Sequence, residues 1–237
     1  MEKIGLFWGS NTGNQEEAAG FLKEYMESEG AQIDEYNIAD TDPKKMLEYK
    51  KLIIGCPTWH IGELQDDWDF IYDKYKELDF NGITAAFFGC GDQVGYADNF
   101  LDAIGLLGKP FMENGGKLIG KWPTEGYEFD NSLALDGDEF LGLGLDNDNE
   151  EELSEERMII WAELIKDGWS KEYPAIWAIW PSQTPHIIDG NHRLQVAIES
   201  SPDLLVPVVM ICQRHLYEQI YDKATTGSWQ WGGDNSF

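Results

Sequence analysis

The sequence predicts an α/β fold in which a five-stranded parallel sheet carries helices on both faces, followed by a small α+β domain. Along the first part of the chain, short apolar segments alternate with helical patterns, and polar loops follow several of these segments. After Trp169 the residue pattern changes. Pairs of apolar residues there lie between prolines, and five of the nine prolines of the chain fall in this part. Strands that alternate with helices are typical of a parallel sheet covered on both faces. We therefore expect two domains, residues 1–169 and 170–237.

The first expected unit is a buried strand at residues 3–8, a loop, and a helix. The strand is the apolar run KIGLFW, and the helix has one apolar face formed by Ala18, Phe21, Leu22, Tyr25 and Met26. The same pattern predicts further strands at 51–56, 83–90, 117–120 and 140–145, and further helices at 66–78, 99–114 and 154–167. Ser154 is the expected N-cap of the last helix. The turn-rich segment 121–139 should interrupt the edge strand as a surface loop with packed aromatic side chains.

The composition is that of a soluble globular protein with an unusual charge. The net charge is −27, and residues 170–237 contribute only −3 of it, so that −24 falls on the first 169 residues. Such a field repels nucleic acid and anionic lipid and attracts basic protein surfaces. No apolar run approaches the length of a membrane span, so we expect a cytoplasmic monomer without membrane contact. The isolated Cys56, Cys90 and Cys212 predict reduced core thiols rather than a metal site or a disulfide framework.

Three loops at the carboxyl ends of expected strands carry unusual residues. Ligands of open parallel sheets bind at this edge. The first loop offers hydroxyls, amides and backbone N–H groups at a helix N-terminus, which suits a phosphate: Ser10, Asn11, Thr12, Gly13, Asn14 and Gln15. The second places a large indole after a buried strand: Pro57, Thr58, Trp59, His60, Ile61 and Gly62. The third, residues 91–99, brings Tyr96 to the same edge.

Each of these loops also has an ordinary structural explanation. The first can be a capped turn, and either aromatic residue can simply pack against the protein. Their joint placement beside an anion-binding loop favours a planar ligand with a phosphate, because two aromatic rings can sandwich a flat ring.

Four motifs occur in order: GLFWGSNTGN, LIIGCPTWHIGELQDDW, FFGCGDQVGYADNF and GLGLDNDN. Together they closely resemble the long-chain flavodoxins over residues 1–168, and the insertion at 121–139 is the feature that separates long from short members. The resemblance implies a flavodoxin-like sheet and a non-covalent FMN whose phosphate binds at residues 10–15. It places the isoalloxazine ring between Trp59 and Tyr96, and it implies further cofactor-binding residues at Cys90, Gly91, Asp92, Asn99 and Asp148.

The function implied by this resemblance is low-potential, one-electron transfer, without catalytic residues or a metal. Nearby carboxylates disfavour a negatively charged reduced flavin, and this lowers the reduction potential of the flavin. The expected partners are basic redox proteins such as a ferredoxin-NADP reductase. The His60–Ile61 peptide should turn over during reduction, against steric resistance because neither residue is Gly. The family pattern has Thr where this chain has Ser10 and Gln15, which puts the strength of phosphate binding in question.

Residues 170–237 resemble the ParB and sulfiredoxin superfamily at a DGxHR-type turn formed by Asp189, Gly190, Asn191, His192 and Arg193. This implies an alternative function for the C-terminal domain, namely ATP or CTP binding with phosphoryl-transfer or nucleotidase activity. The sulfiredoxin nucleophile is Cys, and Asn191 stands there, so that activity is not expected. The other interpretation is a docking or stabilising appendage in which the same residues cap a helix.

Overall fold

The computed structural model describes residues 3–168, 176–180, 186–189 and 208–212. The chain divides into two compact units, residues 1–172 and 173–237. None of the helices among the described residues combines the length and the apolarity that a membrane crossing needs.

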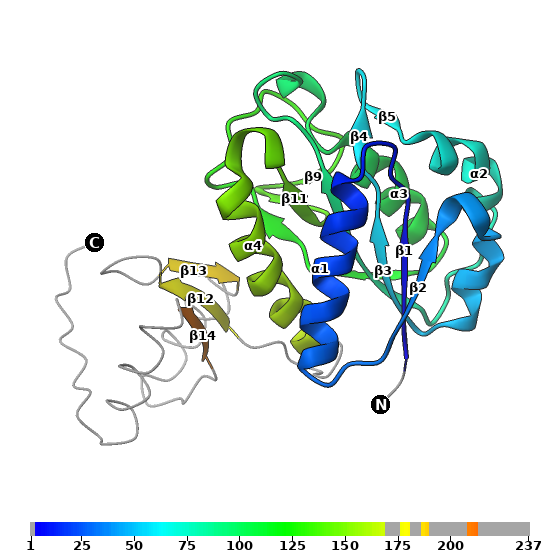
Figure 1. The fold of residues 1–237 in the computed structure, drawn as a ribbon, viewed down its shortest axis with the longest axis horizontal. Helices are drawn as coiled ribbons and strands as arrows, with labels where there is room; N and C mark the ends of the chain where they lie inside the picture. Colours follow the sequence, from blue (N-terminus) through cyan, green and yellow to red (C-terminus); the bar gives the residue numbers. More distant parts are fainter. Residues whose placement is uncertain (1–2, 169–175, 181–185, 190–207, 213–237) are drawn as a thin grey trace, which may run out of the picture. The chain divides into compact units, whose positions relative to one another are not determined.

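The N-terminal unit is built on a parallel sheet with the strand order β11-β6-β3-β1-β2 (Figure 1). The strands are β1 (Ile4–Trp8), β2 (Ile33–Asn37), β3 (Lys51–Gly55), β6 (Thr84–Cys90) and β11 (Leu143–Leu145). Trp8 is in register with Gly55, and Gly55 with Phe88. The carboxyl ends of β1, β3 and β6 therefore meet at one edge, where the strand order reverses, and ligands of such sheets bind at this point.

The edge strand next to β6 is divided in two, as the sequence predicted. Its first part, β7 (Lys117–Ile119), pairs with the start of β6, and its second part, β11, pairs with the end. The insertion between them forms a small antiparallel sheet of β8 (Trp122–Pro123), β9 (Leu135–Asp136) and β10 (Glu139–Phe140). The prediction of one continuous strand over 140–145 was wrong, because Phe140 pairs with Trp122 in this small sheet.

Four helices cover the sheet: α1 (Asn14–Ser28), α2 (Asp66–Lys76), α3 (Asp102–Glu113) and α4 (Asn147–Gly168). Alternate residues of a strand face opposite sides. Phe87 packs against Phe111 of α3 at 5.5 Å between ring centroids, and Phe88 packs against Trp161 of α4 at 6.0 Å. The helices α3 and α4 therefore cover opposite faces, and α1 lies beside α4 (Figure 1). Helices on both faces of a parallel sheet confirm the predicted architecture.

Short elements complete the unit. A hairpin of β4 (Thr58–Trp59) and β5 (Glu63–Leu64) precedes α2, and three 3-10 turns lie at η1 (Ile38–Asp40), η2 (Pro43–Glu48) and η3 (Ala97–Asn99). Strand β2 has no counterpart in the prediction, because IDEYN at the sheet edge buries only its first residue and lacks an apolar run.

The predicted starts of two helices were wrong. The last helix begins at Asn147 and kinks at Glu150, whose φ is −143° and ψ 50°. Ser154 therefore lies inside the helix, where its Oγ donates a hydrogen bond of 3.1 Å to the Glu150 carbonyl, and it is not the N-cap. Helix α3 begins at Asp102 rather than at residue 99, because Leu101 adopts a left-handed conformation, with φ 60°, that separates the helix from η3.

The C-terminal unit contains three described strands, β12 (Ile176–Trp180), β13 (His186–Asp189) and β14 (Val208–Cys212). β12 pairs antiparallel with β13 and parallel with β14. Asp189 ends β13, and the remaining residues of the predicted nucleotide-binding turn, 190–193, lie outside the described residues.

Candidate functional site

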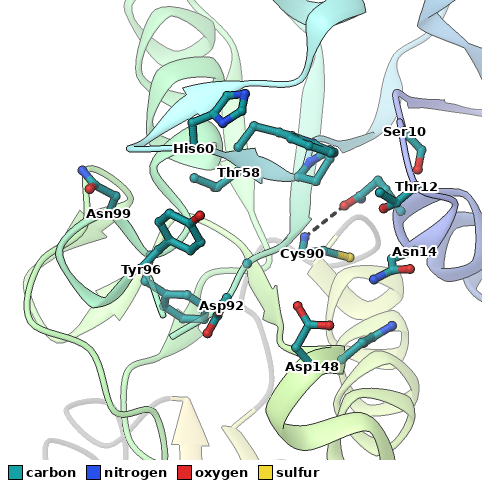
Figure 2. A pocket seen from close by; sticks show the side chains of 16 residues that line it. Ser10, Thr12, Asn14, Thr58, His60, Cys90, Asp92, Tyr96, Asn99 and Asp148 are labelled. Atoms are coloured by element: carbon teal, nitrogen blue, oxygen red, sulfur yellow. Dashed lines mark hydrogen bonds between the residues drawn. The ribbon is translucent and has the colours of Figure 1, made fainter. Parts of the chain in front are cut away.

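A cavity of about 380 Å³ opens at the carboxyl ends of β1, β3 and β6 (Figure 2). Its volume is that of a small-molecule site. The lining residues come from the three loops that the sequence singled out and from the start of α4: Ser10, Thr12, Asn14, Gln15, Pro57, Thr58, Trp59, His60, Cys90, Gly91, Asp92, Tyr96, Asn99, Phe100, Asn147 and Asp148. Of these lining residues, none is Lys or Arg, and two are Asp.

The first loop leaves backbone donors open at the start of α1. Gly13 is the N-cap, with φ 101°, a conformation that strongly favours glycine. Ser10 Oγ accepts the Gly13 N–H at 3.0 Å, which fixes the turn. Because the N-cap residue has no side chain, it provides no acceptor for the first N–H groups of the helix. These groups and the positive end of the helix dipole suit an anionic ligand.

Gln65 attaches this loop to the rest of the site. The side chain is fully buried, and its Oε1 caps α2 by accepting the N–H groups of Asp67 and Trp68. Its Nε2 donates to Asn11 Oδ1 at 2.6 Å. The Trp68 indole N–H donates to the Gly55 carbonyl at 3.0 Å. Gln65 was not predicted from the sequence, because Gln is not among the residue types preferred at helix N-caps.

Two buried polar atoms in the wall of the cavity have no hydrogen-bond partner among the described residues. Gln15 is fully buried, and its Oε1 accepts the Cys90 backbone N–H at 3.0 Å (Figure 2), whereas its Nε2 is unpaired. The second atom is Asn147 Oδ1. Leaving a buried polar group unpaired costs about 1–3 kcal/mol. Both residues line the cavity, and each carries a buried polar atom whose hydrogen-bonding capacity is unused.

The second loop presents Trp59 on a strained turn. His60, directly after it, has φ 46°, which is unusual for a residue with a side chain, and Gly62 has φ 90°. A side chain at position 62 would overlap the Asp102 carboxylate, so the turn requires glycine there. Thr58 Oγ1 accepts the Ala103 N–H at 3.2 Å and fixes the base of the hairpin on α3. The side chains of Trp59 and His60 both line the cavity.

The third loop is organised by carboxylates. Asp92 Oδ1 accepts the N–H groups of Val94 at 3.0 Å and Gly95 at 2.6 Å. The hydrogen bond from Gly95 is the main reason that the pKa of the Asp92 carboxyl lies below its usual range. Asp146 Oδ2 accepts the Gln93 N–H at 3.1 Å. These bonds hold the loop that carries Tyr96, whose side chain is 48% exposed and lines the cavity.

Cys90, which lines the cavity, and Cys56, directly before the second loop, are free thiols, as the sequence predicted. Cys56 and Cys90 are both buried. Burial, with the charges of Asp148 and Asp146 as smaller causes, raises the pKa of the Cys90 thiol to about 12. Burial raises the pKa of Cys56 as well. Both thiols are therefore protonated at neutral pH and are poor nucleophiles or metal ligands. The structure describes the backbone of Cys212 but not its side chain.

The structure brings most of the predicted cofactor-binding residues to one cavity. Four of them, Asn11, Gly13, Ile61 and Gly62, do not line it, but they belong to the turns that shape it. Phe100 and Asn147 line the cavity and were missed, because neither stands out by residue type from its neighbours in sequence.

The family model for flavodoxin matches residues 6–161, about two thirds of the chain. The chain belongs to the flavodoxin family. A flavodoxin of Synechocystis is 49% identical over 166 residues, which cover 70% of this chain and 97% of that protein. Flavodoxin 2 of Escherichia coli is 41% identical over 172 residues, which cover 72% and 98%. The crystal structure of Fusobacterium nucleatum flavodoxin bound to flavin mononucleotide is similar with a TM-score of 0.67 at 26% identity, covering 71% of this chain and 99% of that one.

Proposed function

We propose that the flavodoxin unit, residues 1–169, binds one FMN non-covalently and carries single electrons at low potential between redox proteins. The observation that carries this proposal is a cavity lined both by the start of α1, where the N-cap provides no side-chain acceptor, and by two aromatic residues, Trp59 and Tyr96. FMN has phosphate and ribityl oxygens that accept hydrogen bonds and ribityl hydroxyls that donate them. The proposal also rests on the FMN-bound relative described above.

The phosphate fits the start of α1. The free N–H groups behind Gly13, together with the hydroxyl of Thr12, provide donors without a positively charged side chain. Ser10 Oγ already accepts a hydrogen bond from Gly13, which leaves its O–H free to donate. The Gln that replaces the family's Thr at position 15 adds an amide donor in place of a hydroxyl.

The flat ring fits between the loops that carry Trp59 and Tyr96. Both side chains line the cavity, and stacking on aromatic faces suits a planar ring. FMN supplies the redox chemistry, and the protein binds it, orients it and sets its potential. Asp92 and Asp148 beside the cavity, within a unit of net charge −24, disfavour additional negative charge on the ligand. This lowers the potential at which the bound cofactor accepts its second electron.

The proposed partners are basic redox proteins such as a ferredoxin-NADP reductase, and the proposed location is the cytoplasm. Long-range attraction between a strongly acidic carrier and a basic partner speeds their association, and added salt weakens it. Electron transfer needs no acid or base from the protein, so we propose no catalytic residue.

FMN binding is tested by titrating the apoprotein with FMN and following the loss of flavin fluorescence. We expect one FMN per chain. Trp59→Leu should weaken FMN binding about tenfold, because one aromatic stacking contact contributes roughly 0.5–1.5 kcal/mol beyond its buried area. Phe70→Leu, which changes an exposed aromatic residue outside the cavity, is the matched control and should leave the Kd unchanged. An apoprotein that does not bind FMN would refute the proposal.

For the C-terminal unit we propose nucleotide binding at residues 189–193, as a second candidate function. It is favoured by the position of Asp189 at the end of a described strand, directly before Gly190 and close in sequence to Arg193. Arg193→Ala should abolish ATP and CTP binding in calorimetry and leave FMN binding unchanged. Failure of the unmutated chain to bind either nucleotide would reduce this unit to an appendage.

A further inference from the structure

Phe70 is an unusually exposed aromatic residue on α2. Its side chain is 83% exposed, more than that of any other large hydrophobic residue among those described as exposed. It does not stand alone, because it forms one wall of a surface hollow of about 250 Å³ between α2 and the segment 38–43. Ile38, Pro43 and Ile71 contribute further apolar surface to this hollow. Single exposed apolar residues are common, but an exposed ring at the rim of a hollow offers a place for a partner side chain.

Carboxylates outnumber cations around the ring. Asp40, Asp42 and Asp67 line the same hollow together with one cation, Lys74, and Asp69 is the exposed neighbour of Phe70 on α2. Within the described part of the chain, no ion pair joins any of these four carboxylates to a lysine or arginine. Each has at most local hydrogen bonds, such as the one that Asp42 accepts from the Lys44 N–H. We call Phe70 and these four residues the Phe70 patch.

The patch is connected to the cofactor cavity through the start of α2. Asn11 Nδ2 donates to Asp66 Oδ2 at 3.1 Å, and Gln65 bonds the same Asn11. Phe70 lies one helical turn after Asp66. The β4–β5 hairpin directly before α2 carries Ile61, which is 75% exposed. A protein that covers the cavity mouth can therefore reach the patch at the same time.

We infer that the Phe70 patch is a docking site for the basic surface of a redox partner, with an arginine or lysine side chain of that partner seated against Phe70. This inference rests on the proposed function and names an anchor outside the cofactor cavity. A guanidinium or ammonium group stacks favourably on an aromatic face while its charge meets the carboxylates around it. A second copy of this chain is disfavoured as the occupant, because the four carboxylates of the patch and a net charge of −27 repel an identical surface.

The test uses the FMN-loaded full chain and a ferredoxin-NADP reductase as the basic probe, with the Kd measured by calorimetry at low and high salt. Phe70→Ala should raise the Kd about tenfold, as expected for an aromatic anchor. The double variant Asp40→Asn/Asp69→Asn should weaken binding at low salt and flatten its salt dependence. Leu133→Ala, at an exposed apolar residue of the insertion, is the control and should change the Kd less than twofold.

Two results would overturn the inference. The first is a reductase Kd that stays within about twofold in Phe70→Ala, or the absence of any binding by the unmutated chain. The second is self-association of the chain in sedimentation that Phe70→Ala abolishes while reductase binding is unaffected, which would assign the patch to a second copy. The FMN Kd of each variant is measured in parallel and should not change. A failure of the proposed function would appear as lost FMN binding, whereas a failure of this inference would leave FMN binding intact.

Discussion

Replacing Gln15 by Leu tests how the cavity uses its buried amide. The substitution keeps the approximate volume of the side chain but removes both polar atoms. Loss of Oε1 leaves the Cys90 N–H without its acceptor, which costs about 1–3 kcal/mol of stability. Loss of the unpaired Nε2 relieves a penalty of the same size in the apoprotein. The two effects oppose each other, so the free energy of unfolding of the apoprotein should change by less than about 1 kcal/mol.

The same substitution should have a large effect on FMN binding. If Nε2 donates to an oxygen of bound FMN, Gln15→Leu removes a hydrogen bond of about 1–3 kcal/mol, which corresponds to a Kd raised about 5- to 150-fold. The assay is fluorescence titration with FMN and with riboflavin, alongside urea unfolding of the apoprotein. If the acceptor is the phosphate, riboflavin binding is unaffected; if it is a ribityl oxygen, both ligands weaken. An FMN Kd within twofold of the unmutated value would refute the reasoning.

Three further predictions concern the loops and the core around the cavity. Gly62→Ala should lower the free energy of unfolding in urea by about 2 kcal/mol or more, whereas Gly13→Ala, where an added Cβ meets nothing, should cost about 1 kcal/mol; equal losses would contradict the steric argument. In Cys212→Ser, the two buried thiols should react with a disulfide reagent only after denaturation, and rapid reaction of the folded protein at pH 8 would contradict their raised pKa values. The lowered pKa of Asp92 stabilises the fold above its ordinary pKa of about 4, and this contribution is lost as the pH falls through the folded value. The stability difference between the unmutated chain and Asp92→Asn should therefore shrink in urea unfolding from pH 5 to pH 3, and a constant difference would count against it.

The sequence predicted those parts of the fold in which the apolar residues follow a single pattern, either the continuous run of a buried strand or the spacing of a helix face. The run KIGLFW became β1, since a strand buried on both faces needs consecutive apolar residues. Strand β2 was missed because IDEYN lies at the sheet edge, where half-buried polar side chains are tolerated. Ser154 was placed at a helix start because its residue type is typical of an N-cap, whereas the chain begins the helix at Asn147 and kinks after it.

The candidate site was predictable to the extent that each loop follows a recognisable strand. The cavity draws on the three predicted loops because parallel strands end at one edge. The contacts between loops could not be predicted from local sequence. Gln65 bonds Asn11 across 54 residues, and Gln15 bonds Cys90 across 75. Such pairings depend on the register of β1, β3 and β6, which no local pattern contains.

In the proposed function, this chain binds FMN and uses it for one-electron transfer at low potential. The most direct measurement is the absorbance of the FMN-reconstituted full chain during stepwise electrochemical reduction. We expect a yellow protein that is reduced in two separate one-electron steps, the second at a potential well below that of free FMN. A chain that remains colourless after exposure to FMN, or a bound flavin that takes up both electrons together at the potential of free FMN, would contradict it.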